Sequence, residues 1–188
     1  MKKSPESAPG VWLFAYGSLL LEGHVETEER RLAQLQGFHR ALCVYSHVYR
    51  GTKARPGLVL GLARGGSCLG VALRIAGPKA DAVLGRIRRR ELVTGVYLER
   101  VVSVALRGQG GKPAQRASAV AFIADRSHPQ YAGKLSSRAI LRYLRQGKGT
   151  KGRATDYLFE IMRGLHTLGI RDRALERIAK SVPQKDRG

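Results

Sequence analysis

Cysteine, aromatic residues and acidic residues are all scarce in this chain of 188 residues. The two cysteines, Cys43 and Cys68, cannot form a disulfide framework, and alone they cannot supply the four ligands of a structural zinc site. So few cysteines are typical of a reducing compartment, and we expect a cytoplasmic protein. Aromatic side chains make up only 6% of the residues, which is few for a protein that stacks the bases of single-stranded nucleic acid.

The chain also lacks a long hydrophobic run. The apolar stretch that begins at Val11 is interrupted by Tyr16-Gly17-Ser18, and no small-residue cleavage pattern follows it. It is therefore neither a signal peptide nor a membrane span, and we expect no membrane partner. We interpret residues 11–16 as a buried strand and residues 1–10 as a disordered leader.

Acidic residues number 14 against 34 lysines and arginines, which gives a net charge of +20. Counted by segment, residues 1–40 are neutral, residues 41–90 carry +9, residues 91–150 carry +7 and residues 151–188 carry +4. A basic excess in the middle of a chain favours anionic partners, either nucleic acid or a small acidic substrate drawn by the field. A solvated, arginine-rich surface explains the same composition and remains an alternative.

The apolar pattern changes period along the chain, from strand-like to helical. We expect strands at 11–16, 41–49, 58–63, 68–75, 96–106 and 117–124, with a turn at Gly65-Gly66. We expect helices at 27–36, 78–90, 136–146, 154–167 and 171–181. Strands that mostly precede helices predict a single α+β domain over residues 11–182. Its core is a mixed β-barrel or curled sheet with flanking helices and a helical C-terminal third, followed by a polar tail at 183–188.

Glu91 is one of only four acidic residues between positions 41 and 150, and it directly follows Arg88–Arg90. On the helix predicted before it, Ala80, Leu84 and Ile87 form one apolar stripe, and the next position on that stripe is Glu91. A carboxylate on a buried stripe is a candidate general acid and base. Desolvation raises the pKa of such a group and nearby arginines lower it, so the sequence leaves the direction open. An ordinary helix-end glutamate paired with Arg88 is the alternative.

A glycine-bearing turn, Tyr16-Gly17-Ser18-Leu19, follows the first strand. Glycine lets the backbone approach a ligand closely, and successive N–H groups in such a turn can bind an anion. Ser46 and Arg50-Gly51 follow a later strand. Arg50 is either an ordinary turn residue or a cation that binds a substrate carboxylate. From the residues alone, Tyr131 and Tyr157 are explained as well by core packing as by binding.

Taken together, these segments resemble the γ-glutamylcyclotransferases, in particular their ChaC-like branch. The similar segments, in chain order, are Tyr16–Leu19, Ser46 to Gly57 with its Arg-Gly and Pro-Gly pairs, Arg90-Glu91 with Gly95 and Tyr97, His128–Gly133 and Asp156–Leu158. They span nearly the whole predicted domain, which is more specific than any one of them alone. The resemblance implies a γ-glutamylcyclotransferase-like fold.

The resemblance also implies an activity. Enzymes of this branch release 5-oxoproline from glutathione, leaving Cys-Gly, by attack of the substrate's own α-amine on its γ-carbonyl. Because the nucleophile belongs to the substrate, the resemblance implies neither a cofactor nor a metal. It implies Glu91 as the catalytic acid and base, and a substrate-binding set of Tyr16, Gly17, Ser18, Leu19, Ser46, Arg50, Gly51, Tyr131 and Tyr157.

Two alternatives stay open at this point. The enzyme can act on another γ-glutamyl amine or peptide, because the resemblance does not fix the leaving group. The charge, in turn, is compatible with a nucleic-acid-binding protein on the same fold, although the small number of aromatic residues argues against single-strand binding. The sequence gives no indication of the oligomeric state.

Overall fold

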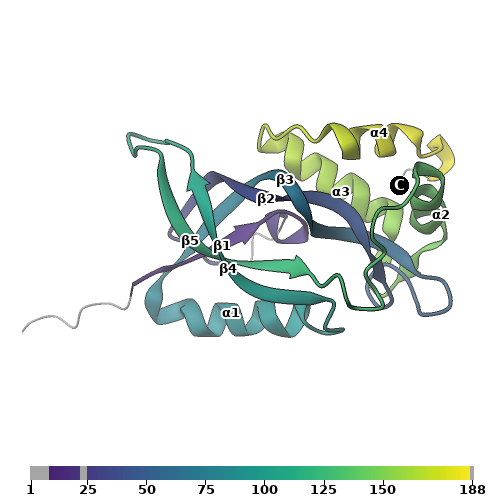
Figure 1. Cartoon of the computed structure of the whole chain (residues 1–188), viewed down its shortest axis with the longest axis horizontal. Coiled ribbons are helices and arrows are strands. Elements are labelled where there is room, and N and C mark those ends of the chain that lie inside the picture. Colours follow the sequence, from purple (N-terminus) through teal and green to yellow (C-terminus); the bar gives the residue numbers. More distant parts are fainter. Residues whose placement is uncertain (1–8, 22–24, 187–188) are drawn as a thin grey trace, which may run out of the picture.

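A computed structural model describes residues 9–21 and 25–186, and its centre is a closed barrel of five strands (Figure 1). The strands are β1 (Val11–Ala15), β2 (Glu29–Ser46), β3 (Gly57–Ile75), β4 (Tyr97–Leu106) and β5 (Gln115–Ala124). Their order around the barrel is β1-β3-β2-β4-β5, and β1 closes it by pairing in parallel with β5. The α+β fold class with a barrel, predicted from the sequence, is confirmed.

The helix predicted over residues 27–36 is wrong, because residues 29–46 form the long strand β2. Arg31, Ala33 and Leu35 are buried, whereas their immediate neighbours are less so, which is the two-residue period of a strand. The cap-like Thr27 and the acidic residues after it gave a local helix signal. Antiparallel pairing with β3 overrides that signal, with Ala33 opposite Gly70 and Leu35 opposite Cys68.

The predicted turn at Gly65-Gly66 is also wrong, because β3 continues through it. Both glycines have positive φ, 95° and 68°, and Gly37 on the facing strand has a φ of 82°. The register shifts between Gln36 and Phe38 at the same level. These glycines therefore form an irregularity within a continuous pair of long strands, where an L side chain would be strained. The two strands predicted at 58–63 and 68–75 are one.

The four α-helices follow the predicted positions closely. They are α1 (Gly77–Glu91), α2 (Ser137–Gln146), α3 (Ala154–Thr167) and α4 (Arg173–Ser181). Helix α1 lies along one side of the barrel, and α2, α3 and α4 gather on the opposite side (Figure 1). Within residues 9–21 and 25–186, no helix is both long and apolar enough to cross a bilayer.

Part of the basic excess lies inside the protein. The guanidinium of Arg31 is buried and donates to the carbonyl oxygens of Arg107 and Pro113. Arg40 is also buried and donates to the carbonyl oxygens of Tyr16 and Leu69. These arginines satisfy backbone groups of the barrel, so the formal charge overstates what a partner meets at the surface.

The ends of the predicted domain are only partly visible. Most of the predicted leader, residues 1–8, lies outside the described residues. In the predicted polar tail, Gln184–Asp186 forms a short 3-10 helix. The Asp186 carboxylate accepts hydrogen bonds from Arg145 and Arg153, which attaches this segment to α2 and to the residue before α3.

The strand directions bring distant segments together at one end of the barrel. Strands β1, β2 and β5 run in one direction, and β3 and β4 run antiparallel to their neighbours. The carboxyl ends of β1, β2 and β5 therefore meet the amino ends of β3 and β4. The turn after β1, the segment after β2 and the residues before β4 all converge at this end.

Candidate active site

A cavity of about 120 Å³ lies at this end of the barrel, many times the space that one water needs. Its walls come from the turn after β1, the end of β2, the start of β3 and β4, the end of α1, and α3. Eight of the ten residues predicted for the site line it: Tyr16, Gly17, Ser18, Leu19, Ser46, Arg50, Glu91 and Tyr157. Segments from most of the chain thus form one site.

Glu91 is the only acidic residue among those lining the cavity. It is the last residue of α1, whose buried face includes Ala80, Leu84 and Ile87, so the predicted apolar stripe is confirmed. The Glu91 side chain is 15% exposed. Burial raises its pKa above the ordinary value, while the charges of Arg90 and Lys151 oppose that shift. A raised pKa suits a carboxylate that must both accept and return a proton near neutral pH.

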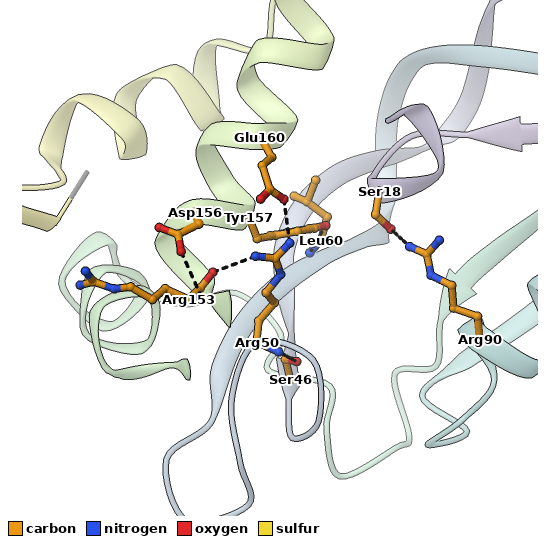
Figure 2. A network of polar contacts seen from close by, with 9 residues as sticks. All are labelled: Ser18, Ser46, Arg50, Leu60, Arg90, Arg153, Asp156, Tyr157 and Glu160. Atoms are coloured by element: carbon orange, nitrogen blue, oxygen red, sulfur yellow. Dashed lines mark hydrogen bonds and ion pairs between the residues drawn. The ribbon is translucent and has the colours of Figure 1, made fainter. Parts of the chain in front are cut away.

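Arg90 contacts both Glu91 and the glycine-bearing turn. Its Nε atom lies 3.5 Å from Oε1 of Glu91. Its Nη2 atom donates to Oγ of Ser18 at 2.6 Å (Figure 2). This bridge fixes the end of α1 relative to the turn after β1, so the carboxylate and the turn backbone face the same space.

The turn itself is held from behind by a buried arginine. Arg40 donates from Nε to the carbonyl oxygen of Tyr16 at 2.5 Å, and from Nη1 to the carboxylate of Asp172 at 3.0 Å. Asp172 is also the N-cap of α4, where its other carboxylate oxygen accepts from the Leu175 N–H. Helix α4, β2 and the turn are therefore tied through one guanidinium, which restricts the position of the turn.

Five tyrosines line the cavity, and three of them, Tyr16, Tyr97 and Tyr157, have hydroxyls with backbone partners. Tyr16 donates to the carbonyl oxygen of Phe122 at 2.7 Å, and Tyr97 donates to that of Leu60 at 2.5 Å. The Tyr157 hydroxyl accepts from the Leu60 N–H at 3.3 Å, and its own proton has no acceptor among the described residues. Burial raises the pKa of all three hydroxyls, so each remains a protonated donor.

Arg50 lines the cavity and reaches from the segment after β2 to α3 (Figure 2). Its guanidinium donates to the Glu160 carboxylate at 2.7 Å and to the Arg153 carbonyl oxygen at 3.2 Å. It also lies 5.4 Å from the centre of the Tyr157 ring. The Arg50 N–H donates to Oγ of Ser46 at 3.0 Å, which closes the turn after β2. Arg50 thus orders this wall in addition to bringing a positive charge to it.

The remaining two predicted site residues, Gly51 and Tyr131, are not among the residues that line the cavity. A Cβ atom on Gly51 would lie 2.1 Å from the Gly57 nitrogen, so this glycine permits a close crossing of two backbone segments. Tyr131 forms an isolated bridge with Val44 and packs beside β2. Both lie behind the wall of the cavity.

Sequence reasoning assigned no role to two further lining residues, Tyr97 and Lys151. Tyr97 belongs to the same family-like segment as Glu91. Its closeness to Glu91 in the sequence could have indicated that it lies at the site. Lys151 had no comparable signal. It lies in the turn between the two-residue strands β6 (Lys148–Gly149) and β7 (Gly152–Arg153), and only the fold brings it to the cavity.

The described residues contain no group of three or more His, Cys, Asp or Glu side chains that could hold a metal ion. Neither cysteine lines the cavity, and burial raises the pKa of both thiols, that of Cys43 to about 12. The lining offers one carboxylate, three cationic side chains and the tyrosine hydroxyls. Such a set can bind a small anionic molecule and transfer a proton within it.

Comparison with known proteins agrees with this architecture. A crystal structure of a γ-glutamylcyclotransferase specific to glutathione from yeast superposes with a TM-score of 0.83, at 20% identity, over 95% of this chain and 97% of that one. A second solved structure, described as a γ-glutamyl cyclotransferase, superposes with a TM-score of 0.55 at 15% identity, over 93% and 88% of the two chains. At these identities the likeness establishes the fold, and the predicted γ-glutamylcyclotransferase-like fold is confirmed.

Sequence relatives extend the comparison. The Escherichia coli (strain K12) protein named glutathione-specific gamma-glutamylcyclotransferase is 33% identical over 178 residues, covering 95% of this chain and 74% of that protein. Gamma-glutamylcyclotransferase 2-3 from Arabidopsis thaliana is 28% identical over 180 residues, covering 92% and 88% of the two chains. The family model described as ChaC-like protein matches residues 11–185. The chain therefore belongs to the ChaC-like protein family.

Proposed function

We propose that this protein is a γ-glutamylcyclotransferase that converts glutathione into 5-oxoproline and Cys-Gly. Membership of the ChaC-like family, together with the name of the Escherichia coli relative, supports this activity and this substrate. The observation that carries the proposal in the structure is one largely buried carboxylate, Glu91, beside the Tyr16–Leu19 turn in a ligand-sized cavity.

The reaction needs a base from the protein but no nucleophile from it, because the nucleophile is the substrate's own α-amine. The α-amine of a γ-glutamyl peptide is mostly protonated at neutral pH, and Glu91 takes the proton from this ammonium. The freed nitrogen attacks the γ-carbonyl carbon of the same residue, which forms the C–N bond of the five-membered lactam. The peptide C–N bond to cysteine then breaks, and Glu91 returns the proton to the departing nitrogen. The attacking nitrogen loses its second proton as the lactam forms, and that proton ends on the amine of Cys-Gly, which leaves as an ammonium. Atoms and charge then balance without a protein nucleophile.

The cavity must hold the γ-glutamyl arm in the folded pose that brings amine and carbonyl together. Intramolecular reactions in a well-oriented pose gain effective molarities of roughly 10⁵–10⁸ M, so orientation supplies much of the acceleration. Gly17 lines the cavity without a side chain, so it leaves space for this arm that a methyl group in ordinary contact with the Tyr157 hydroxyl, at 3.6 Å, would fill. Arg90, Arg40 and Tyr16 keep the turn in place around it.

Charge develops on the γ-carbonyl oxygen as the ring closes. The N–H groups of Ser18 and Leu19 precede the hydrogen-bonded Leu20 N–H of the 3-10 turn, so they have no acceptor within that turn. We assign these N–H groups and the available Tyr157 hydroxyl as donors to the developing oxyanion. Arg50 contributes positive charge from the opposite wall.

Incubating the purified protein with glutathione, and measuring 5-oxoproline and Cys-Gly, tests the proposal. The two products are expected in equal amounts, because one bond cleavage yields both. γ-Glutamyl amines and other γ-glutamyl dipeptides, assayed in parallel, test the alternative substrate class. Release of 5-oxoproline from these compounds but not from glutathione would reject the substrate and retain the reaction.

A further inference from the structure

Three cationic side chains line the cavity, and they differ in whether they already have hydrogen-bond or ion-pair partners within the protein. Arg90 contacts Glu91 and donates a hydrogen bond to Ser18. Arg50 donates hydrogen bonds to Glu160 and to the Arg153 carbonyl oxygen (Figure 2). The Lys151 ammonium has neither a hydrogen bond nor an ion pair among the described residues. Its Nζ atom lies over the Tyr49 ring, 4.9 Å from the ring centre.

Lys151 is also held in place by its backbone. The Lys151 N–H donates to the Tyr49 carbonyl oxygen at 2.8 Å, and the neighbouring Thr150 N–H donates to that of Val48 at 2.9 Å. The turn between β6 and β7 is therefore docked on the segment that follows β2. Tyr49 and Val48 line the cavity together with Lys151, so the ammonium has a defined place at its wall.

The three cations lie at different depths. The side chains of Arg50 and Arg90 are 11% and 22% exposed, whereas Lys151 is an exposed residue. Lys151 is thus at the mouth of the cavity and the guanidiniums are nearer its floor. Burial, followed by the charges of Arg90 and Arg50, lowers the pKa of Lys151, and the Glu91 carboxylate opposes that shift only in part. A bound anion would further offset the repulsion from the two arginines.

The proposed substrate presents charges in a matching arrangement. Glutathione has an ammonium and a carboxylate on its γ-glutamyl α-carbon, and a second carboxylate on its glycine. When Glu91 takes the proton of the ammonium, the first carboxylate is held near Glu91 and Arg90. The cysteine and glycine residues extend roughly 7 Å beyond the reacting carbonyl, far enough for the second carboxylate to reach the mouth of the cavity.

We propose, on the basis of the function proposed above, that Lys151 binds the glycine carboxylate of glutathione and thereby selects peptides that end in a free carboxylate. Lys151 then recognises the Cys-Gly part of the substrate, which is the leaving group, and takes no part in proton transfer. The ammonium gains a charged partner at a site that is open to water, so the effect on kcat/KM is modest. It falls on KM more than on kcat.

The test compares two substrates and three proteins. The substrates are glutathione and its analogue with a glycine carboxamide, which keeps the shape and removes the charge. The proteins are the wild type, Lys151→Gln, and the control Lys148→Gln, which removes an exposed lysine three positions away in β6 that does not line the cavity. The measured quantity is the ratio of kcat/KM for glutathione to kcat/KM for the amide, from 5-oxoproline release.

We expect the wild type and Lys148→Gln to prefer glutathione by roughly threefold to tenfold, since an ion pair at an exposed site is worth about that much. Lys151→Gln is expected to bring the ratio close to one, mainly through a higher KM for glutathione. An unchanged ratio in Lys151→Gln overturns the inference. If that unchanged ratio comes with an equal loss on both substrates, Lys151 acts on the γ-glutamyl half or on Glu91 instead. A wild type that releases no 5-oxoproline from either peptide rejects the proposed function itself.

Discussion

Glu91 keeps a raised pKa although the Nε atom of Arg90 lies only 3.5 Å from its carboxylate. Burial therefore outweighs the attraction of the neighbouring guanidinium. Arg90 also donates to Ser18, so the same side chain tunes the carboxylate and anchors the turn that faces it.

The first prediction concerns the pH dependence of the reaction. Glu91 must be ionised to accept the proton of the ammonium, so kcat/KM is expected to fall as the pH drops through the raised pKa of Glu91. Arg90→Met removes a charge that lowers this pKa, and the acid limb should move to higher pH. Ser18→Ala is the matched control, because it removes the Arg90–Ser18 hydrogen bond and leaves the charge. A limb that moves in Ser18→Ala as much as in Arg90→Met would contradict this assignment.

The second prediction concerns stability. A carboxyl whose pKa is raised in the folded state binds protons more tightly there than in the unfolded chain, so ionisation of Glu91 costs folding free energy. The cost is absent below the ordinary glutamate pKa, develops as the pH rises through the raised one, and is complete above it. Glu91→Gln should therefore be more stable than the wild type at neutral pH, with a difference that shrinks toward low pH. Urea denaturation across that range measures it. A difference that grows toward low pH would contradict the raised pKa.

The third prediction contrasts two glycines. A Cβ at Gly17 would meet its nearest neighbour, the Tyr157 hydroxyl, at 3.6 Å, which is ordinary contact, so Gly17→Ala should fold with nearly unchanged Tm. Its methyl group would occupy cavity space, and kcat/KM should fall by at least about tenfold, the effect of losing roughly 1.4 kcal/mol.

Gly51 is the structural counterpart. A Cβ there would lie 2.1 Å from the Gly57 nitrogen and 2.4 Å from the Ser46 carbonyl oxygen, and backbone atoms cannot move aside cheaply. Gly51→Ala should lose at least about 3 kcal/mol of stability, or fail to fold. Thermal denaturation of both variants decides the matter. A stable Gly51→Ala with a specific loss of substrate affinity would instead place Gly51 in the site.

The fourth prediction concerns Arg40, whose buried guanidinium joins the Tyr16 carbonyl to Asp172. Arg40→Met leaves the Asp172 carboxylate and two carbonyl oxygens without their donor, and the free energy of unfolding should fall by about 3–5 kcal/mol. The surviving folded fraction should also have a lower kcat, because the turn loses its support. Arg177→Met, which removes an exposed arginine of α4, is the control and should change neither quantity. Full activity and stability in Arg40→Met would show that the turn is held by other contacts.

Some of these features were visible in the sequence because they depend on neighbouring residues. The apolar stripe of α1 is periodic, so it predicted both the helix and the position of Glu91 on its buried face. The Tyr16–Leu19 turn and the Asp156–Leu158 segment are short motifs, and the family resemblance gave them a role. The helices after residue 136 were predicted well for the same reason, since each has its own local period.

Other features depend on partners far away in the chain. The start of strand β2 was predicted as a helix from the local signal at Thr27, whereas its real environment depends on distant partners, such as the carbonyl oxygens of Arg107 and Pro113 that accept from Arg31. Arg40 forms a hydrogen bond with Asp172, which lies 132 positions away in the sequence, and no local sequence pattern predicts that contact. Lys151 reaches the cavity only because the turn between β6 and β7 docks on the segment after β2. Composition showed that the chain is basic without showing which cations are buried.

The most direct test of the proposed function is the turnover of glutathione by Glu91→Gln, which keeps the size of the side chain and removes its ability to carry a proton. With folding verified by circular dichroism and by thermal denaturation, 5-oxoproline formation should fall by about 10²- to 10⁴-fold, the usual contribution of a general acid and base. Glutathione should still bind to the variant. Ring closure at the wild-type rate in a folded Glu91→Gln protein would contradict the central role assigned to this carboxylate.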